Sequence, residues 1–536
     1  MFGQIVFRLY RPRPSLSDPP APRERTGQWH SWVYRNRGQV GPSRFRFLNI
    51  EREISQASDW NNPAWEKLWL YHLHYFDDLN SENALTRATW HHELIERWIA
   101  ENPPAAGNGW EPYPLSLRIV NWIKWSWSGF VLSAVALRSL ANQARYLRRR
   151  LEYHLFGNHL LANAKALVFA GLFFEGPESE KWLQAGLSIL KREFAEQILA
   201  DGGHFERSPM YHAIVLEDVL DLLALDRIFP AALPPEFLEY WERLANKMFG
   251  WLTAMCHPDG GISFFNDAAF GAAPTHAQLR VCADALDFGA DSASGTGVLQ
   301  LEPSGYVRIQ RDPLLVILDA APVGPDYMPG HAHADTLSFE LSWNGQRVLT
   351  NSGTSTYGAG PQRTRERSTA AHNTVEVDAE NSSDVWDAFR VARRARPFGL
   401  QIEAAAGVLR ASCSHDGYKR LPGSPVHRRT IELRGCALQV SDTISGRGSH
   451  RAAGYFHLQP GLRLEEGATG DWLVELARGV RLRIVGQNGL RLKREEGLYS
   501  LEFGAPMPRP VLVWRLEGEL PLAATVDICE ETMTVK

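Results

Sequence analysis

The spacing of apolar residues changes once along this chain, near residue 295. Before it, from about residue 60, apolar residues recur every three or four positions in segments of about two to five helical turns, which is typical of amphipathic helices. After it, short alternating runs separated by turn residues dominate, which is typical of antiparallel strands. The sequence therefore predicts a helical domain followed by a large antiparallel β-sandwich.

The individual segments follow the same division. The expected helices are Leu79–Ala100, Leu115–Trp127, Leu132–Glu152, His159–Phe174, Lys181–Leu199 and Tyr211–Ile228. The expected strands are Tyr306–Ile309, Leu314–Leu318, Leu337–Trp343, Thr374–Val377, Thr430–Leu433, Leu438–Val440, Leu473–Leu476, Val480–Ile484 and Val511–Leu516. Clusters of Pro and Gly separate the helices. Successive helix pairs around one core predict an α/α toroid, which is an incomplete helical barrel.

With 536 residues, the chain is too long for one compact core, so several domains are expected. Residues 1–45 are rich in Pro, Arg and Ser and are expected to form an irregular arm. We expect the helical toroid over residues 46–292 and the sandwich over residues 293–536.

Composition excludes several classes of protein. Hydrophobic content of 44% and charged content of 22% are those of an ordinary globular protein, and the net charge of −4 favours no nucleic-acid partner. The five cysteines are scattered, which predicts neither a zinc knuckle nor a disulfide framework. The sequence contains no run of about 18 apolar residues, so we expect no membrane insertion. Oligomeric state has no signal in the sequence.

The first residues carry no recognisable export signal. Arg8, Arg11 and Arg13 interrupt the apolar run in Met1–Pro14, and no small-residue cleavage site follows. This predicts a cytoplasmic protein. A misassigned start would hide a leader, in which case a periplasmic location is expected.

The segment Gly330–Asp335 concentrates two imidazoles and a carboxylate just before the alternating run Leu337–Trp343. Residues two apart share a face of a strand, so His331 and His333 can point the same way. Imidazole titrates near neutral pH and also binds metals, so acid–base work and a metal site are both open. Hydrogen bonding to the loop backbone is the third possibility.

Three further polar segments are candidates. Asn158 and His159 open a helix, where Asn is also a common cap. Tyr211 stands at a helix start near Arg207, where a cation and the helix terminus can lower the pKa of a phenol; simple packing of the ring is the alternative. The alternating run Arg363–Arg367 can meet an acidic ligand or form a solvated edge strand.

Taken together, these segments resemble the heparinase II/III-like family of polysaccharide lyases. Asn158-His159, Tyr211 and His331–Asp335 occur in the order, and at about the separations, that the family shows. The segments Lys67–Phe76 and Gly109–Leu115 also resemble bacterial members near exopolysaccharide gene clusters. The resemblance covers residues 60–460 and implies an α/α toroid followed by an antiparallel sandwich, with the active site between them.

The family implies cleavage of an acidic, uronic-acid-containing polysaccharide by β-elimination. Neutralising the sugar carboxylate makes the neighbouring C5 proton acidic, a base removes that proton, and an acid protonates the leaving oxygen. By the match, Asn158 and His159 neutralise the carboxylate, Tyr211 is the acid and possible base, and His331 is the second acid–base group. The expected substrate contacts are Asn163, Arg207, His212, Tyr357 and Arg363.

No cofactor is required for this chemistry, but some family members hold a structural zinc ion. The positions that match its ligands are His333, Asn351 and His372. Asn stands where zinc-bearing relatives commonly have Asp, and an amide is a poorer zinc ligand than a carboxylate. A zinc site and a metal-free hydrogen-bonded group are therefore both open.

Two other functions compete with the lyase. A toroid glycoside hydrolase needs a pair of carboxylic acids; Glu206, Asp218, Asp267 and Asp335 are available but show no recognisable pairing in the sequence. A non-catalytic polysaccharide-binding protein of an exopolysaccharide cluster would bind the same polymer without cleaving it.

Overall fold

A computed structural model describes residues 12, 17–31, 33, 35–155, 157–288, 295–405 and 407–531. The chain divides into two compact units. The first comprises Met1–Ile198, Ala213–Asn246 and Ala277–Ala290, and the second comprises Leu199–His212, Lys247–His276 and Asp291–Lys536. The predicted arm over residues 1–45 lies partly outside the described residues, and the predicted boundary at residues 292 and 293 lies wholly outside them.

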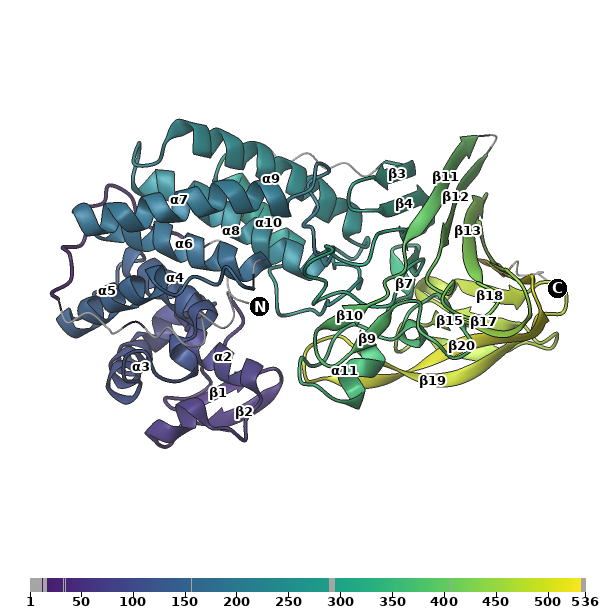
Figure 1. Ribbon diagram of the computed structural model, residues 1–536, viewed down its shortest axis with the longest axis horizontal. Helices are drawn as coiled ribbons and strands as arrows, with labels where there is room; N and C mark the ends of the chain where they lie inside the picture. Colours follow the sequence, from purple (N-terminus) through teal and green to yellow (C-terminus); the bar gives the residue numbers. More distant parts are fainter. Residues whose placement is uncertain are drawn as a thin grey trace. The chain divides into compact units, whose positions relative to one another are not determined.

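Helices dominate the first unit (Figure 1). They are α2 (Lys67–Tyr75), α3 (Ala88–Glu101), α4 (Pro112–Trp127), α5 (Ala134–Arg148), α6 (Gly157–Phe173) and α7 (Pro177–Gln197). Three more helices have residues in both units: α8 (Pro209–Ile228), α9 (Pro235–Met255) and α10 (His276–Ala285). One short hairpin precedes them, made of β1 (Arg44–Phe47) and β2 (Ile50–Glu53). None of the helices in the described part of the chain is long and apolar enough to span a bilayer.

Helix α6 is the buried centre of this unit, and glycine lets α7 pack directly against it. A Cβ atom on Gly171 of α6 would lie 2.6 Å from the backbone nitrogen of Leu183, and one on Gly186 of α7 would lie 2.7 Å from the carbonyl oxygen of Ala164. Larger side chains at these positions would push the two backbones apart. The close crossing fixes the start of α6, where Asn158 lies.

The predicted helix over Leu79–Ala100 is wrong in its first part, because α3 begins at Ala88. Residues 77–80 and 84–87 form 3₁₀ turns instead, and Asn83 between them has a left-handed φ of 56°. The buried Asp78 carboxylate accepts hydrogen bonds from Arg87 Nε at 2.9 Å and His91 Nε2 at 2.8 Å. These tertiary contacts outweigh the helical spacing of the apolar residues.

The second unit is built from antiparallel sheets, whose colours run from teal through green to yellow in Figure 1. A five-stranded sheet has the order β3-β4-β5-β6-β7, an eight-stranded sheet the order β11-β12-β13-β14-β21-β18-β17-β16, and a four-stranded sheet the order β19-β20-β15-β8. A separate two-stranded hairpin pairs β9 with β10.

The strand bounds are as follows. They are β3 (Gly297–Leu301), β4 (Tyr306–Arg311), β5 (Leu314–Asp319), β6 (Phe339–Trp343), β7 (Gln346–Leu349), β8 (Val375–Val377), β9 (Asp384–Trp386), β10 (Arg390–Ala392), β11 (Pro397–Ala405), β12 (Val408–His415), β13 (Val426–Arg434), β14 (Ala437–Ser445), β15 (Ser449–His457), β16 (Arg463–Glu466), β17 (Trp472–Glu475), β18 (Arg481–Gly486), β19 (Leu492–Ser500), β20 (Pro506–Glu519) and β21 (Leu522–Glu530).

Side chains of the larger sheets alternate between core and surface, with a burial period of two along β13 and β14. The strand β6 differs, because its polar positions are also buried. His257 explains this: its Nε2 lies 2.8 Å from Glu340 Oε2 and its Nδ1 lies 2.7 Å from Ser342 Oγ. The alternation in Leu337–Trp343 therefore predicted a strand correctly but a solvated face wrongly.

The solvated edge strand considered for Arg363–Arg367 is wrong. Pro361–Glu366 forms a short helix, α11, and the side chains of Arg363 and Arg367 are buried. Four residues apart, they lie on one face of this turn of helix. A run this short has no clear period, so sequence spacing alone could not separate the two structures.

Candidate active site

A fully buried carboxylate, Asp267 in the loop between α9 and α10, organises the candidate active site of the second unit. Its Oδ2 accepts from His331 Nδ1 at 2.8 Å and from Arg363 Nη2 at 2.7 Å. Its Oδ1 accepts from His333 Nε2 at 2.9 Å, from Thr354 Oγ1 at 3.1 Å and from a second nitrogen of the same guanidinium. The two histidines thus converge on one carboxylate, although their segment is a loop and not a strand.

Asp267 is held in its ionised form. Burial alone would raise the pKa of this carboxyl, but the Arg363 guanidinium and the hydrogen bonds from His331 and His333 outweigh burial and hold the pKa well below its usual range. A carboxylate without a proton can only accept hydrogen bonds, so the Nδ1 atom of His331 carries hydrogen. Nε2 is then the nitrogen of His331 that can take up a proton.

Tyr211, the third residue of α8, lies against His331. Their ring centroids are 4.0 Å apart, and the Tyr211 hydroxyl lies 2.9 Å from the Tyr357 hydroxyl. Ser208 Oγ accepts from the Tyr211 backbone N–H at 3.2 Å and donates to the Asp267 carbonyl at 2.5 Å. The start of α8 and the Asp267 loop are therefore fixed to one another, and with them the phenol and the imidazole.

Two neighbours set the electrostatics of this pair. Burial, followed by the charge of Asp267, raises the pKa of Tyr357 well above its usual value, so its phenol keeps its proton at neutral pH. The buried Glu206 carboxylate lies 3.8 Å from His331 Nε2. The His331 side chain is 17% exposed, whereas those of Asp267 and His333 are fully buried. Within this group of acids and bases, His331 is thus open to solvent.

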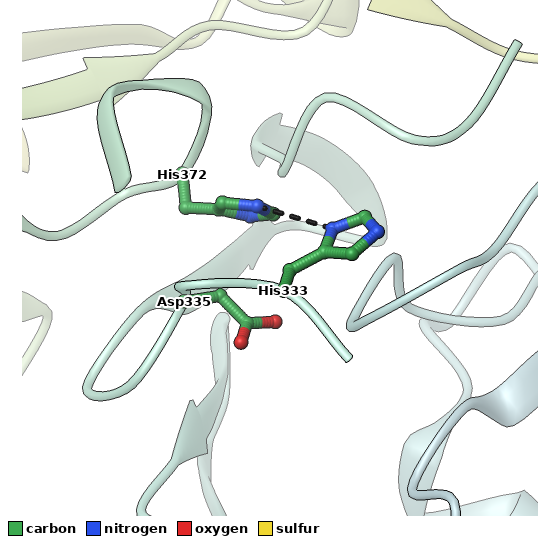
Figure 2. A group of neighbouring side chains, drawn as sticks. All are labelled: His333, Asp335 and His372. Carbon is green, nitrogen blue, oxygen red and sulfur yellow. Dashed lines mark hydrogen bonds between the residues drawn. The ribbon is translucent and has the colours of Figure 1, made fainter. Parts of the chain in front are cut away.

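His333 continues the same network away from Tyr211. Its Nδ1 lies 3.2 Å from His372 Nε2, and the two rings form a buried group with the Asp335 carboxylate (Figure 2). Burial lowers the pKa of His333 to about 4, so this imidazole is neutral at neutral pH. Asp335 was not among the positions that match the zinc ligands of the family. Asn351 donates through Nδ2 to Ser338 Oγ at 3.5 Å, and its Oδ1 accepts from the backbone of Asn373 at 3.1 Å.

This group fits a zinc ion. The candidate ligand atoms of His333, Asp335 and His372 lie within 4.8 Å of one another. Two nitrogens on one tetrahedral zinc are about 3.3 Å apart, close to the 3.2 Å between the two imidazoles. The bond from His333 Nε2 to Asp267 is the contact that orients many zinc-binding histidines.

Two of the predicted substrate-contacting residues, Arg207 and His212, form hydrogen bonds within the protein. Arg207 donates through Nε to the Ser304 carbonyl at 2.9 Å and through Nη1 to the Phe205 carbonyl at 3.0 Å. His212 is fully buried; its Nε2 bonds the Met248 carbonyl at 2.9 Å and its Nδ1 accepts from the His204 backbone N–H. Burial lowers the pKa of His212 to about 4. These contacts stabilise the loop before α8, and a substrate role for either residue stays a prediction.

The second predicted motif lies in the first unit, at the start of α6. Both ends of the Asn163 side-chain amide form hydrogen bonds within the protein. Its Oδ1 accepts from the Glu152 backbone N–H at 2.9 Å, and its Nδ2 donates to Ser116 Oγ at 3.1 Å. His159 lies with Nδ1 3.3 Å from the Glu152 carboxylate, and its ring centroid is 4.3 Å from that of Tyr113. Within the described residues, no hydrogen bond engages the Asn158 amide. Of the two asparagines, Asn158 is thus the one whose amide can serve a ligand.

Sequence reasoning missed the organising role of Asp267, which it considered only as one of several acids for a hydrolase. Asp267 follows Phe264, Phe265 and Asn266 in a loop, and a single Asp there has no spacing that marks it. Arg363 and Arg367 were visible as part of a basic run, but their burial was not. Arg363 contacts Asp267 on one side and donates through Nε to the Ala388 carbonyl at 3.0 Å on the other.

Comparison with known proteins places the chain in a family. The family model for the heparinase II/III N-terminus matches residues 73–288, and the heparinase II/III-like, C-terminal model matches residues 293–525. The chain therefore belongs to the heparinase II/III-like family.

Individual relatives have different names. A heparin-sulfate lyase of Bacteroides stercoris is 28% identical over 376 residues, which are 66% of this chain and 53% of that protein. The FtsZ-localized protein C of Caulobacter vibrioides is 28% identical over 346 residues, which are 60% of this chain and 56% of that protein. The chain thus spans about half the length of these curated relatives.

Solved structures share the fold. A crystal structure of heparinase III has a TM-score of 0.68 at 18% identity and covers 86% of this chain and 76% of its own. The chondroitin AC lyase of Streptomyces coelicolor A3 has a TM-score of 0.53 at 11% identity, covering 93% of this chain and 77% of its own. The predicted fold class, an α/α toroid followed by an antiparallel β-sandwich, is confirmed.

Proposed function

We propose that this protein is a polysaccharide lyase that cleaves an acidic, uronic-acid-containing polysaccharide by β-elimination. The observation that carries the proposal is the contact between Tyr211 and His331, a phenol and an imidazole whose ring centroids lie 4.0 Å apart, one hydrogen-bonded to Tyr357 and the other to Asp267. Membership of the heparinase II/III-like family and the relatives named as lyases support it.

Tyr211 is the proposed acid, and its phenolate form is the proposed base. Because burial keeps the Tyr357 phenol protonated, Tyr357 can donate its hydrogen bond to the Tyr211 oxygen at 2.9 Å. A donated hydrogen bond stabilises a phenolate, which makes proton exchange at Tyr211 easier. Tyr211 can then protonate the leaving O4 oxygen or remove the C5 proton.

His331 is the proposed second acid–base group. The Asp267 carboxylate fixes the hydrogen on Nδ1 and stabilises the imidazolium that forms when Nε2 takes up a proton. This is the arrangement that carboxylate–histidine pairs use in general-base catalysis. Because Arg363 is buried against Asp267, we propose that it positions this pair through the carboxylate.

The sugar carboxylate must be neutralised before C5 gives up its proton. We assign this role to the Asn158 amide and to His159, as the family match implies. The absence of a hydrogen bond from Asn158 to other described residues supports a ligand-binding amide, since a buried amide without a partner is costly. In contrast, the contacts of Asn163 with Glu152 and Ser116 support a structural role.

The contacts of Asp267 disfavour the hydrolase alternative. A glycoside hydrolase needs one carboxylic acid and one carboxylate at the scissile bond. The Asp267 carboxylate accepts hydrogen bonds from four side chains and is fully buried, so it cannot reach a substrate. Glu206 alone does not make the required pair.

We also propose that the reaction needs no metal, because Tyr211 and His331 supply both proton transfers. A structural zinc ion would be held by His333, Asp335 and His372, where it would supply a positive charge that ties their loops together. We expect chelation to lower the melting temperature of zinc-loaded protein while activity at lower temperature persists. Loss of activity on chelation, with recovery on adding zinc, would make the metal part of the reaction.

The function is tested by an ultraviolet screen against uronate polymers such as heparan sulfate, chondroitin sulfate and alginate. The wild type should produce the absorbance of an unsaturated uronate with at least one of them. Tyr211→Phe should lower that rate by roughly 10³-fold, the size of a general acid–base contribution. Tyr455→Phe, at a half-buried tyrosine on β15, is the matched control and should keep the activity. New reducing ends without absorbance would instead identify a hydrolase.

A further inference from the structure

The hairpin of β9 and β10 presents two large aromatic side chains to solvent. Trp386 ends β9 and is 48% exposed, and Phe389 in the turn is 42% exposed. Two exposed rings three residues apart form a small apolar surface, and such surfaces often bind ligands. Sequence reasoning did not single out either residue.

Buried arginines hold this hairpin in place. Arg367 Nη1 donates to the carbonyls of Trp386 at 3.4 Å, Asp387 at 3.3 Å and Ala388 at 3.1 Å. The same guanidinium donates through Nη2 to the Ala332 carbonyl at 3.0 Å, next to His331. The backbone that carries Trp386 is therefore tied to the backbone that carries His331.

The hairpin adjoins the acid–base pair directly. The Phe389 ring centroid lies 5.7 Å from that of His331 and 5.3 Å from that of Tyr357. Arg363, which bonds Asp267, also donates to the Ala388 carbonyl in the hairpin turn. A sugar ring bound on these aromatics would lie beside the atoms proposed to exchange protons.

The charge of the hairpin suits an anionic ligand. Arg390, at the start of β10, is exposed, and no carboxylate among the described residues forms an ion pair with it. Asp384 pairs with Arg393 at 2.7 Å, and Asp387 lies within the electrostatic influence of Arg367. Arg390 is thus the hairpin's available cation, next to two exposed rings.

We propose that Trp386, Phe389 and Arg390 form a subsite for an acidic pyranose, whose apolar face packs on the aromatic rings while its carboxylate or sulfate pairs with Arg390. Aromatic faces pack against the C–H groups of a sugar, and arginine binds carboxylate and sulfate through its planar fork. The identity of the ligand as the substrate of this protein rests on the proposed lyase function, but binding itself does not.

The test measures binding by calorimetry in the Tyr211→Phe background, so that turnover does not interfere. The probes are heparan sulfate, chondroitin sulfate and alginate, with uncharged dextran as a neutral polymer. Trp386→Ala is the main variant because its side chain is exposed, and Arg390→Gln removes the charge. Phe398→Ala is the matched control, since Phe398 on β11 is 46% exposed.

We expect an acidic polymer to bind, dextran not to bind, and Trp386→Ala to raise the Kd about tenfold, the effect of losing one well-packed aromatic contact. Arg390→Gln should weaken binding of the acidic polymer and remove part of its salt dependence. Phe398→Ala should leave the Kd unchanged. An equal Kd for Trp386→Ala and the control, or no binding of any acidic polymer, would overturn the subsite.

The subsite and the lyase can fail separately. Binding that depends on Trp386, without any unsaturated product from the wild type, would retain the subsite and refute the lyase. Unsaturated product with a KM that Trp386→Ala does not change would retain the lyase and refute the subsite.

Discussion

Two clusters in the second unit are made of the same side chains, one aspartate, one arginine and two histidines. In the first, Asp267 accepts hydrogen bonds from His331, His333 and Arg363. Its ionised form is stabilised by the guanidinium, and it lies among loops that follow α9 and precede β6.

In the second cluster, Asp442 of β14 accepts from His427 Nε2 at 2.8 Å and from Arg429 Nε at 2.8 Å. His427 Nδ1 lies 3.1 Å from His415 Nε2. All of these side chains lie on neighbouring strands of the eight-stranded sheet. Burial would raise the pKa of Asp442, but Arg429 and His427 lower it to about 2.

The clusters differ in access and not in chemistry. The side chain of His331 is 17% exposed and contacts Tyr211, whereas those of His427 and Asp442 are at most 2% exposed. An acid–base group must reach its substrate, so the first cluster can act in catalysis and the second can only stabilise the sheet.

Replacing one histidine in each cluster should separate activity from stability. We expect His331→Ala to lower the rate of elimination on the order of 10³-fold, since it removes a proposed proton carrier. His427→Ala should keep the rate per folded molecule but lower the free energy of unfolding by about 2–3 kcal/mol, because Asp442 loses a buried partner. Initial rates and urea denaturation of both variants measure the two effects. Equal elimination rates per folded molecule for His331→Ala and His427→Ala would contradict the proposed difference between the clusters.

Replacing each aspartate by asparagine should repeat the contrast, with a smaller effect on the rate. Asp267→Asn removes the charge that fixes the His331 tautomer. We therefore expect kcat to fall on the order of 10²-fold, the low end of a general acid–base contribution, with KM nearly unchanged. Asp442→Asn should leave kcat unchanged and cost about 3–5 kcal/mol of stability, because Arg429 is left buried without a countercharge. A fall in kcat for Asp442→Asn at a temperature where it is folded would contradict the assignment.

Acid should affect the structural cluster in a defined direction. The folded pKa of Asp442 is about 2, below its ordinary value of 3.8, so the unfolded chain binds the proton more tightly. The carboxylate therefore contributes stability above the ordinary pKa and loses it as the pH falls towards 2. We expect the stability gap between wild type and Asp442→Asn to narrow by about 1 kcal/mol from pH 5 to pH 3. A difference in unfolding free energy that widens between pH 5 and pH 3 in urea titrations would contradict a lowered pKa of Asp442.

Sequence patterns predicted the larger features because these depend on local spacing. The change from helical to strand periodicity, and the candidates Tyr211 and His331, are visible in consecutive residues. The neighbours of His331 come from separate loops: Asp267 precedes it by 64 residues, and Phe389 follows it by 58. Their association depends on tertiary packing, which no local period encodes.

The family resemblance singles out His331 and not His427, but the local sequence does not show why the two clusters differ in access. His331 lies in the loop before β6 and His427 lies at the start of β13, and each has an arginine or aspartate nearby in the chain. Only the fold shows that one imidazole lies at a surface beside a phenol and the other inside a sheet. Likewise, the spacing of Arg363 and Arg367 is compatible with a strand or a helix. Only the structure shows that a helix forms and that both side chains are buried.

We propose that the Tyr211–His331 pair breaks a glycosidic bond by elimination and not by hydrolysis. Mass spectrometry of the products from a cleaved uronate polymer distinguishes the two reactions. Elimination adds no water, so the fragments should sum to the mass of the polymer, and one fragment of each pair should be unsaturated. Fragments whose summed mass includes one added water for each bond cleaved would contradict elimination and indicate hydrolysis.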